Sequence, residues 1–320
     1  MTKFILKRLL ITIPVIFFLS FLTLFLINLV PGSYFDQLRL NPQIGEEVIE
    51  QYEEKFHINE NVFVQYFYWL KGIIKLDFGY SFTYQMPVIS LIGSRLFNTF
   101  LLSFCAFLLS WGMAIPLGVL AAFMKDSLFD RALRGIAYIF LSLPGFFLAL
   151  VLMFIWAHWT YLPLGGMRSI YFDELSIMGK LVDIAKHMLV PLVVLCTAST
   201  SYLFRLMRSN MLDVLNRDFV RVLHTRGLPS YMIIFKHVLR NAINPLVTIL
   251  GFQLPALFSG AALLEIVTGW PGLGSMMLHA VRSQDIFLVM GNMVMISFLL
   301  IVGNIIADIL LAITDPRIRY

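Results

Sequence analysis

The sequence predicts an all-α, polytopic membrane protein with six transmembrane helices. Hydrophobic residues make up 59% of the 320-residue chain and charged residues only 13%, about half of the roughly 25% that is typical of soluble domains. The mean hydropathy is +0.83, and the apolar residues are concentrated in long runs. A helix needs about 20 mainly apolar residues to cross a hydrocarbon core of roughly 30 Å, and six runs meet or approach that length.

The predicted spans lie at residues 9–30, 100–124, 132–157, 188–204, 242–264 and 286–311. The first run follows three basic residues and in that respect resembles a secretory signal. Its apolar stretch is longer than the roughly 7–15 residues of a signal core, and no Ala-x-Ala cleavage site follows. We therefore expect a retained spanning helix. The fourth run is the shortest and contains Pro191, but its length is still within the range of spanning helices.

The chain divides into three expected parts: an N-terminal transmembrane helix at 1–30, an external loop at 31–97, and a core transmembrane domain of five helices at 98–320. The loop is too long to be a simple connection. Segments 46–56 and 62–76 have the apolar spacing of helices, and Tyr66 and Trp69 suit a membrane interface. We expect a small external cap of short helices, which either docks a partner or covers the spans.

The distribution of charge predicts that both termini are cytoplasmic. Cations accumulate in the loops that share a side with the N-terminus, as the positive-inside rule requires of cytoplasmic segments. They are Lys3, Lys7, Arg8, Lys125, Arg131, Arg134, Arg205, Arg208, Arg217, Arg221, Arg226, Lys236, Arg240, Arg317 and Arg319. The opposite loops contain most of the carboxylates, many of them between residues 46 and 60.

The composition and motifs argue against several functional classes. The net charge of +5 does not indicate nucleic-acid binding, because the cations lie in loops between apolar runs. Cys105 and Cys196 fall inside predicted spans, so we expect no disulfide framework. The six histidines have no metal-ligand spacing. Ser275 and His279 are four residues apart but lack an oriented base and a nucleophile turn, so we expect no enzyme.

The source of transport energy is a further constraint. A secondary transporter is one alternative, but it would favour acidic residues near mid-membrane. Asp308, with Asn304, lies near the inner end of the last span, where a structural contact is the favoured interpretation. The chain has no Gly-x-x-x-x-Gly-Lys-Ser/Thr phosphate-binding loop. If transport is active, its energy must come from another polypeptide.

A glycine-rich turn follows the fifth predicted span. Residues 265–275 read Glu-Ile-Val-Thr-Gly-Trp-Pro-Gly-Leu-Gly-Ser, and three glycines with one proline predict a tight, irregular turn. Backbone of this kind at membrane depth persists only where protein or a watery cavity surrounds it. Two interpretations remain open: the turn lines the external mouth of a pathway, or it is an ordinary outer turn anchored by Trp270.

The basic segment 217–242 predicts a cytoplasmic docking surface. Arginine costs roughly 3 kcal/mol or more at the bilayer centre, so the segment lies outside the hydrocarbon. We expect a short amphipathic helix that offers apolar Phe219, Val222 and Leu223 to a hydrophobic groove, with Arg221 and Arg226 beside them. A glycine and then a proline end this helix. The alternative is a basic loop attracted to anionic lipid.

Several ordered motifs then resemble one known family. They are Arg-Val-Leu-His-Thr-Arg-Gly at 221–227, Arg-Asn-Ala-Ile-Asn-Pro at 240–245, Trp-Pro-Gly-Leu-Gly at 270–274 after Glu265, and Asp-Pro-Arg-Ile-Arg at 315–319. Weaker matches are Lys-Arg-Leu-Leu at 7–10, Leu-Asp-Phe-Gly at 76–79, Arg-Leu-Phe-Asn-Thr at 95–99 and Leu-Pro-Leu-Gly-Gly at 162–166. Nearly end to end, the chain resembles the B-type permease subunit of dipeptide, oligopeptide and nickel ABC importers.

This resemblance implies a type I ABC importer permease fold and a coupling loop at 206–241. A coupling helix in the loop would contact an ATPase subunit through Phe219, Arg221, Val222, Leu223, His224, Thr225, Arg226 and Gly227. Arg221, Val222 and Leu223 occupy the family's Glu-Ala-Ala positions, and Gly227 is its glycine. The acidic first residue and the small residues that follow it are therefore replaced here. Residues expected at the outer gate or pathway are Asn98, Gln253, Ser259, Glu265, Trp270, Pro271, Gly272 and Gly274.

The resemblance also implies the protein's partners and location. They are a homologous second permease chain, two cytoplasmic ABC ATPases and an external substrate-binding protein, in the cytoplasmic membrane of a bacterium or archaeon. The partner ATPases would bind ATP and Mg²⁺, and this chain would bind no cofactor and no metal. The implied cargo is a di- or oligopeptide, with nickel or a metal chelate as the alternative.

Overall fold

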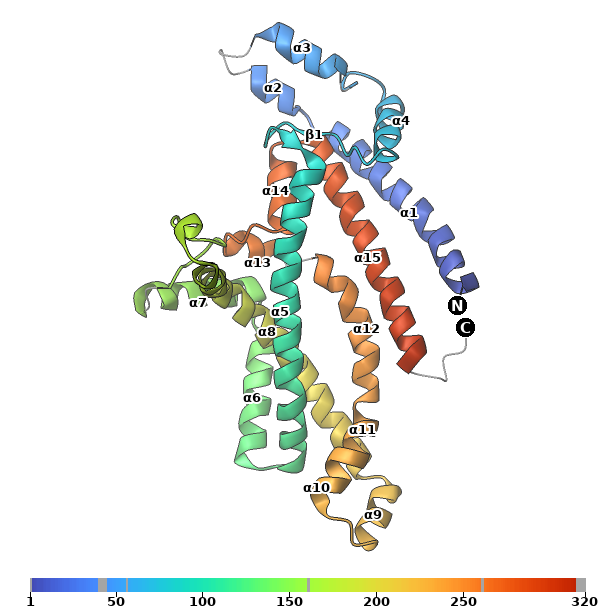
Figure 1. Ribbon diagram of the computed structural model, residues 1–320, viewed down its shortest axis with the longest axis vertical. Helices are drawn as coiled ribbons and strands as arrows, with labels where there is room; N and C mark the ends of the chain where they lie inside the picture. Colours follow the sequence, from blue (N-terminus) through green and yellow to red (C-terminus); the bar gives the residue numbers. More distant parts are fainter. Residues whose placement is uncertain (1, 40–44, 56, 160–161, 260–261, 315–320) are drawn as a thin grey trace.

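The computed structural model describes residues 2–39, 45–55, 57–159, 162–259 and 262–314. The described chain is almost entirely helical (Figure 1). The expectation of an all-α polytopic membrane protein is confirmed, with one two-stranded hairpin as an addition. The last motif of the sequence, at 315–319, lies outside the described residues.

The elements run in the following order. They are α1 (Thr2–Leu29), α2 (Tyr34–Arg39), α3 (Glu46–Lys55), α4 (Val62–Ile73), β1 (Tyr80–Ser81), β2 (Met86–Pro87), α5 (Val88–Phe123), α6 (Leu128–Ser142), α7 (Gly145–Trp159), a 3₁₀ turn (Phe172–Glu174), α8 (Ile177–Leu215), α9 (Asp218–Thr225), α10 (Ser230–Met232), a π-helical turn (Ile233–Val238), α11 (Leu239–Ala242), α12 (Asn244–Ser259), α13 (Ala262–Val267), α14 (Leu273–Arg282) and α15 (Ile286–Thr314).

Four helices in the described ranges are long and apolar enough to cross a membrane, and each contains a predicted span. They are α1, α5, α8 and α15. Helix α5 has 36 residues and α8 has 39, so at 1.5 Å per residue both exceed a hydrocarbon core of roughly 30 Å. These two helices therefore continue beyond the hydrophobic spans read from the sequence.

The third predicted span is not one continuous helix, and that prediction was wrong. Helices α6 and α7 meet at a bend of 105°. The cause is Pro144, which lacks an N–H and disfavours helical backbone at the preceding residue. Leu143 accordingly has extended backbone, with φ −91° and ψ 128°. Counting the bent pair as one span raises the number of candidate spans in the described chain to five.

The fifth predicted span, at 242–264, is described in two parts. Its main part is α12, which has 16 residues and is therefore only about 24 Å long. The short helix α13 follows, and residues 260–261 between them lie outside the described chain.

The centre of the molecule is the pair α5 and α8, with α6 packed along α8 and α12 between α5 and α15 (Figure 1). The contact between α5 and α8 is very close. A Cβ atom added to Gly118 would lie 2.7 Å from the Cβ of Met207, nearer than packed carbon atoms can approach. Glycine at this position therefore sets the spacing of the two central helices.

The described elements that follow α1, from α2 to β1, gather at the end of the bundle opposite α9 (Figure 1). The helices expected at 46–56 and 62–76 are present as α3 and α4, and Phe56 lies outside the described residues. The hairpin of β1 and β2 was not predicted. Buried Asp285 fixes this hairpin, because its carboxylate accepts hydrogen bonds from the Ser81 hydroxyl at 2.6 Å and the Thr83 N–H at 3.1 Å.

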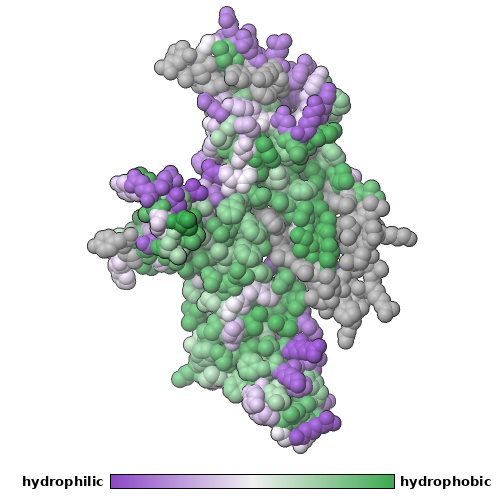
Figure 2. Space-filling model, in the orientation of Figure 1, coloured by the Kyte–Doolittle hydropathy of each residue, from purple (hydrophilic) through white to green (hydrophobic). Residues whose placement is uncertain are grey.

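Figure 2 shows a broad hydrophobic surface, with hydrophilic side chains gathered mainly towards the two ends of the molecule and on the lobe around α7. This is the surface expected of a chain embedded in a bilayer. Cys105 and Cys196 are both free thiols. Among the residues that the structure describes, no three His, Cys, Asp or Glu side chains form a potential metal site.

Candidate functional site

Helix α9 lies at the end of the molecule opposite α2 and α3 (Figure 1) and ends as the sequence predicts. Gly227 has a φ of +77°, in the left-handed region that favours glycine. The Gly227 N–H donates to the His224 carbonyl at 3.0 Å, and the Leu228 N–H donates to the Leu223 carbonyl at 3.4 Å. This pair of bonds is a Schellman motif, with Pro229 following it to prevent further helix.

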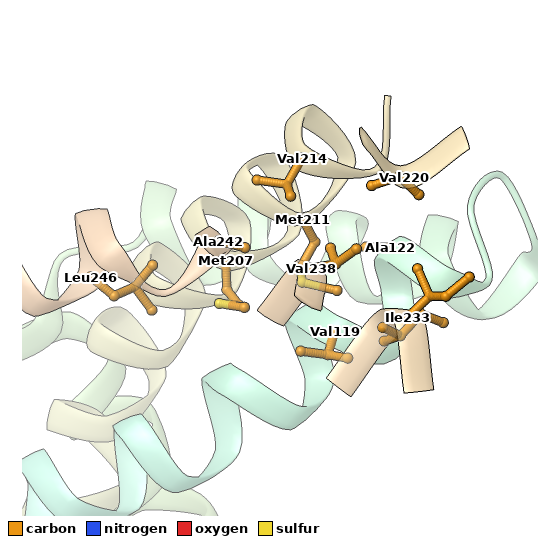
Figure 3. Close-up of a cluster of buried hydrophobic side chains, with 11 residues drawn as sticks. Val119, Ala122, Met207, Met211, Val214, Val220, Ile233, Val238, Ala242 and Leu246 are labelled. Atoms are coloured by element: carbon orange, nitrogen blue, oxygen red, sulfur yellow. The ribbon is translucent and has the colours of Figure 1, made fainter. Parts of the chain in front are cut away.

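The inner face of α9 is anchored in an apolar cluster, which we call the coupling core (Figure 3). Val220 is only 3% exposed and belongs to this cluster, whose other side chains come from α5, α8, the π-helical turn, α11 and α12. The members are Val119, Ala122, Met207, Met211, Val214, Val220, Ile233, Ile234, Val238, Ala242 and Leu246. Because Val220 shares one core with the ends of α5, α8 and α12, displacement of α9 must displace those ends or disrupt the core.

The outer face of α9 carries most of the residues expected to dock on a partner. Phe219 is 36% exposed and Val222 is 49% exposed. Arg221, His224, Thr225 and Arg226 are exposed as well. The Arg221–Asp218 ion pair, at 3.6 Å, is open to solvent and contributes little to stability. The described surface of α9 is therefore apolar at its centre and basic around it.

One expected docking residue is only partly exposed. We placed Leu223 on the apolar face offered to a partner, but it is half-buried against the coupling core. The reason is helix geometry. Leu223 is three residues after Val220 and four after Phe219, so on the helix it lies between the buried Val220 and the exposed Phe219. The exposed apolar surface is thus smaller than predicted.

The return from α9 to the membrane contains a π-helical turn. Ile233, Ile234 and Val238 within it are buried in the coupling core. The Asn210 side-chain amide of α8 donates to the Ala242 carbonyl at 3.1 Å, which joins the end of α11 to α8. Pi-helical turns are rare and occur frequently at functional sites.

The second expected region, the outer turn, is built around a buried carboxylate. Glu265 of α13 is 1% exposed. One oxygen accepts from the Thr99 hydroxyl at 2.8 Å, and the other accepts from the N–H groups of Gly274 at 2.8 Å and Ser275 at 3.0 Å. The N–H donors belong to the first turn of α14, where a negative charge is also favoured by the helix dipole.

The glycines of the turn are required by this carboxylate. A Cβ atom on Gly272 would overlap the Glu265 carboxyl group, and one on Gly274 would lie 2.5 Å from the Cα of Ala262. The turn is also bonded to α5, because Trp270 donates to the Asn98 carbonyl at 3.1 Å and the Asn98 amide donates to the Pro271 carbonyl at 2.9 Å. These hydrogen bonds join α5, α13 and the start of α14 into one compact unit, which we call the brace.

Burial changes how the outer turn is interpreted. Glu265, Trp270, Gly272 and Gly274 are buried within this chain, so in this conformation they support the turn and do not themselves line an open surface. Gln253 lies elsewhere, on α12, where its carbonyl accepts from the Trp111 indole N–H of α5 at 2.8 Å. Ser259 ends α12, and its side chain lies outside the described residues.

Sequence reasoning missed a buried ion pair near the coupling core. Asp130, at the start of α6, is fully buried and bonded by both carboxylate oxygens to Arg208 of α8. The only sequence signal was an Asp three residues after Ser127 at a helix start, which is equally typical of an exposed N-terminal turn. The partner, Arg208, is 78 residues away and had no local signal.

Comparison with known proteins decides the class. The family described as "Binding-protein-dependent transport system inner membrane component" matches residues 114–320, and its N-terminal component matches residues 1–103. The chain belongs to this family. It is a multi-pass inner-membrane permease component of an ABC transporter complex, not the ATP-hydrolysing subunit. The family resemblance read from the motifs is confirmed.

Full-length relatives of the permease have been named in several bacteria. It is 35% identical to the oligopeptide transport system permease protein AppB of Bacillus subtilis, over 100% of both chains. It is 31% identical to the dipeptide transport system permease protein DppB of Escherichia coli, over 100% of this chain and 99% of the other. The oligopeptide permease OppB of Haemophilus influenzae is 35% identical over 100% of both chains.

A solved structure supports the fold. A chain of the MetNI methionine ABC transporter, described as inward facing, superposes with a TM-score of 0.50 and 16% identity, over 69% of the permease and 97% of that chain. At this identity the likeness concerns the fold alone. The importer permease fold expected from the motifs is confirmed.

Proposed function

We propose that this permease forms half of the translocation pathway of an ATP-driven importer of di- or oligopeptides. A homologous permease chain supplies the other half, and an external binding protein delivers the cargo. The peptide assignment is supported by the names of full-length relatives at 31% and 35% identity, and it is favoured over nickel or a metal chelate for that reason. Both termini, and α9, lie on the cytoplasmic side.

The energy for transport comes from two cytoplasmic ATPase subunits, which bind ATP and Mg²⁺. These subunits bind this chain through α9. Exposed Phe219 and Val222 fill an apolar groove on the ATPase, while Arg221 and Arg226 pair with acidic residues at its rim. His224, Thr225 and Gly227 complete the contact. The observation that carries this proposal is the two-sided construction of α9, with an apolar and basic outer face on a helix rooted through Val220 in the coupling core.

The mechanism follows from that anchorage. When ATP draws the two ATPases together, α9 is displaced, and the coupling core passes the displacement to the ends of α5, α8 and α12. Close-packed interiors transmit strain because they compress little. The inner ends of the helices move together, and the pathway opens towards the outside. Hydrolysis then resets the inward-facing arrangement.

Replacing Gly227 with valine tests the proposal. A β-branched residue in the left-handed region is strained by about 1–2 kcal/mol or more, so the C-terminus of α9 should distort. In a reconstituted transporter we expect the peptide moved per ATP hydrolysed to fall several-fold.

Gly32→Val is a matched control. Gly32 also has a positive φ, of +89°, and an added Cβ would make only ordinary contact with the Gln284 side chain, at 3.6 Å, but it lies in the loop between α1 and α2. The control should keep normal peptide transport per ATP. Equal coupling in both variants would contradict the role of α9.

A further inference from the structure

We propose that Asp130 and Arg208 are a positioning pair that makes α6 move with α8, so that force applied at α9 reaches the outer turn. This role rests on the proposed function, because it needs α9 to be the point where force enters. The pair touches neither cargo nor nucleotide. It acts by holding two helices together.

The contact is short, and its carboxylate is buried. Arg208 Nε lies 2.6 Å from Asp130 Oδ1, and Arg208 Nη2 lies 2.7 Å from Oδ2. These parallel bonds form a bidentate pair, the arrangement that fixes both distance and orientation. Asp130 Oδ2 also accepts from the Asp126 N–H at 3.0 Å, and Arg134 Nε lies 3.3 Å from Oδ1. The Asp130 side chain is 0% exposed.

The pair lies beside the coupling core on α8. Met207 and Met211, which flank Arg208 in sequence, both belong to that core with Val220 of α9. One short stretch of α8 therefore contacts the coupling core through apolar side chains and α6 through charge. A second contact joins the same two helices. The Arg205 guanidinium of α8 lies 4.6 Å from the centroid of the Tyr138 ring of α6.

A continuous series of contacts leads from α6 to the outer turn. Helix α6 continues through the bend at Pro144 into α7. There Leu148 and Ala149 pack with Val194 of α8 and Leu264 of α13. The residue after Leu264 is Glu265, the carboxylate at the centre of the brace. The order of contact is α9, the π-helical turn, α8, α6, α7 and then α13.

The turn before α6 is rigid at the point where the pair forms. Asp126 adopts a φ of +62°, and the Ser127 hydroxyl accepts from the Asp130 N–H at 3.2 Å. Removing one partner of a buried ion pair leaves an uncompensated charge, which is strongly destabilising. Because separation is so unfavourable, α6 follows α8 as one body when α8 is displaced.

The test is peptide moved per ATP hydrolysed by the whole transporter, reconstituted in liposomes with its partner permease, both ATPases and the loaded binding protein. Asp130→Asn keeps the shape of the side chain and removes its charge. We expect the ratio to fall about fivefold or more, the lower end of the range for coupling between sites, while ATP hydrolysis continues. Asp126→Asn is the matched control, because its carboxylate is 62% exposed and lies 3.8 Å from Arg134; its ratio should not change.

A merely structural role predicts a different pattern. Uptake and ATP hydrolysis would fall together with the yield and melting temperature of the complex, and the ratio would stay at the wild-type value. That result would overturn the proposal. If Asp130→Asn fails to assemble, Arg208→Lys decides the question, because it keeps the charge and loses one of the parallel bonds. A normal ratio in an assembled Arg208→Lys complex would overturn the proposal equally.

The experiment distinguishes a wrong positioning role for Asp130 and Arg208 from a wrong proposed function. Copurification of the ATPases with each variant reports whether α9 still docks, since neither residue lies on its outer face. If a variant retains the ATPases and moves the normal amount of peptide per ATP hydrolysed, only the positioning role of Asp130 and Arg208 is contradicted. If cysteines placed on α9 never crosslink to an ATPase, the proposed function itself fails, whatever the ratio in the Asp130 variants.

Discussion

Glu265→Ala is expected to lower the free energy of unfolding of the assembled permease by about 3 kcal/mol, because each buried donor left without an acceptor costs about 1–3 kcal/mol. The lost carboxylate accepts from Thr99, Gly274 and Ser275 and is nearly inaccessible to solvent. Without it, the first turn of α14 separates from α13. Thermal unfolding of the purified complex measures the effect, and uptake should fall with it.

Glu265→Gln is the matched control. Its carbonyl oxygen can still accept from the Gly274 and Ser275 N–H groups, and its amide can donate to the Thr99 hydroxyl oxygen. We expect most of the stability to return. If alanine and glutamine variants unfold at the wild-type temperature, the buried carboxylate does not hold the outer turn together.

Gly272→Ala is the second large effect, because a single added methyl group has no space. Its Cβ would overlap the Glu265 carboxyl group, which three donors hold in place. Overpacking in a well-packed site costs about 1–3 kcal/mol, and here relief requires breaking hydrogen bonds as well. We expect the purified complex to unfold at a lower temperature and the transporter to take up less peptide.

Gly112→Ala provides the comparison for this variant. Gly112 lies within α5, and a Cβ atom there would meet nothing within 4 Å. Alanine is favoured over glycine inside a helix by about 0.5–1 kcal/mol, so stability should be equal or higher. An equal loss in both variants would show that close approach at Gly272 is not the cause.

The long helices were predictable because their signal is local. Uninterrupted apolar runs predicted the spans within α1, α5 and α15, and no tertiary information was needed. The same reasoning failed at Pro144. Proline is tolerated inside membrane helices when neighbours satisfy the freed carbonyl, as Pro116 within α5 illustrates. Composition alone does not distinguish a tolerated proline from one at which the chain turns.

In the candidate sites, too, features with a local sequence signal were predictable, and features that depend on tertiary packing were not. The end of α9 was predictable, because a glycine followed closely by a proline is a local signal. The direction of Leu223 was not, because the coupling core that attracts it is assembled from α5, α8 and α12. Glu265 accepts from Thr99, 166 residues earlier, and Asp130 pairs with a residue 78 positions away. Such contacts exist only after the helices have packed.

The most direct measurement of the central claim is site-specific crosslinking from α9 in the assembled transporter. Single cysteines at Phe219, Val222 and Val220 have contrasting environments, since the first two are exposed and Val220 is 3% exposed. Cysteines at Phe219 and Val222 are predicted to capture an ATP-hydrolysing subunit, with a yield that changes when ATP binds, while the cysteine at Val220 captures none. An intact, active transporter in which neither exposed position captures that subunit would contradict the coupling role of α9.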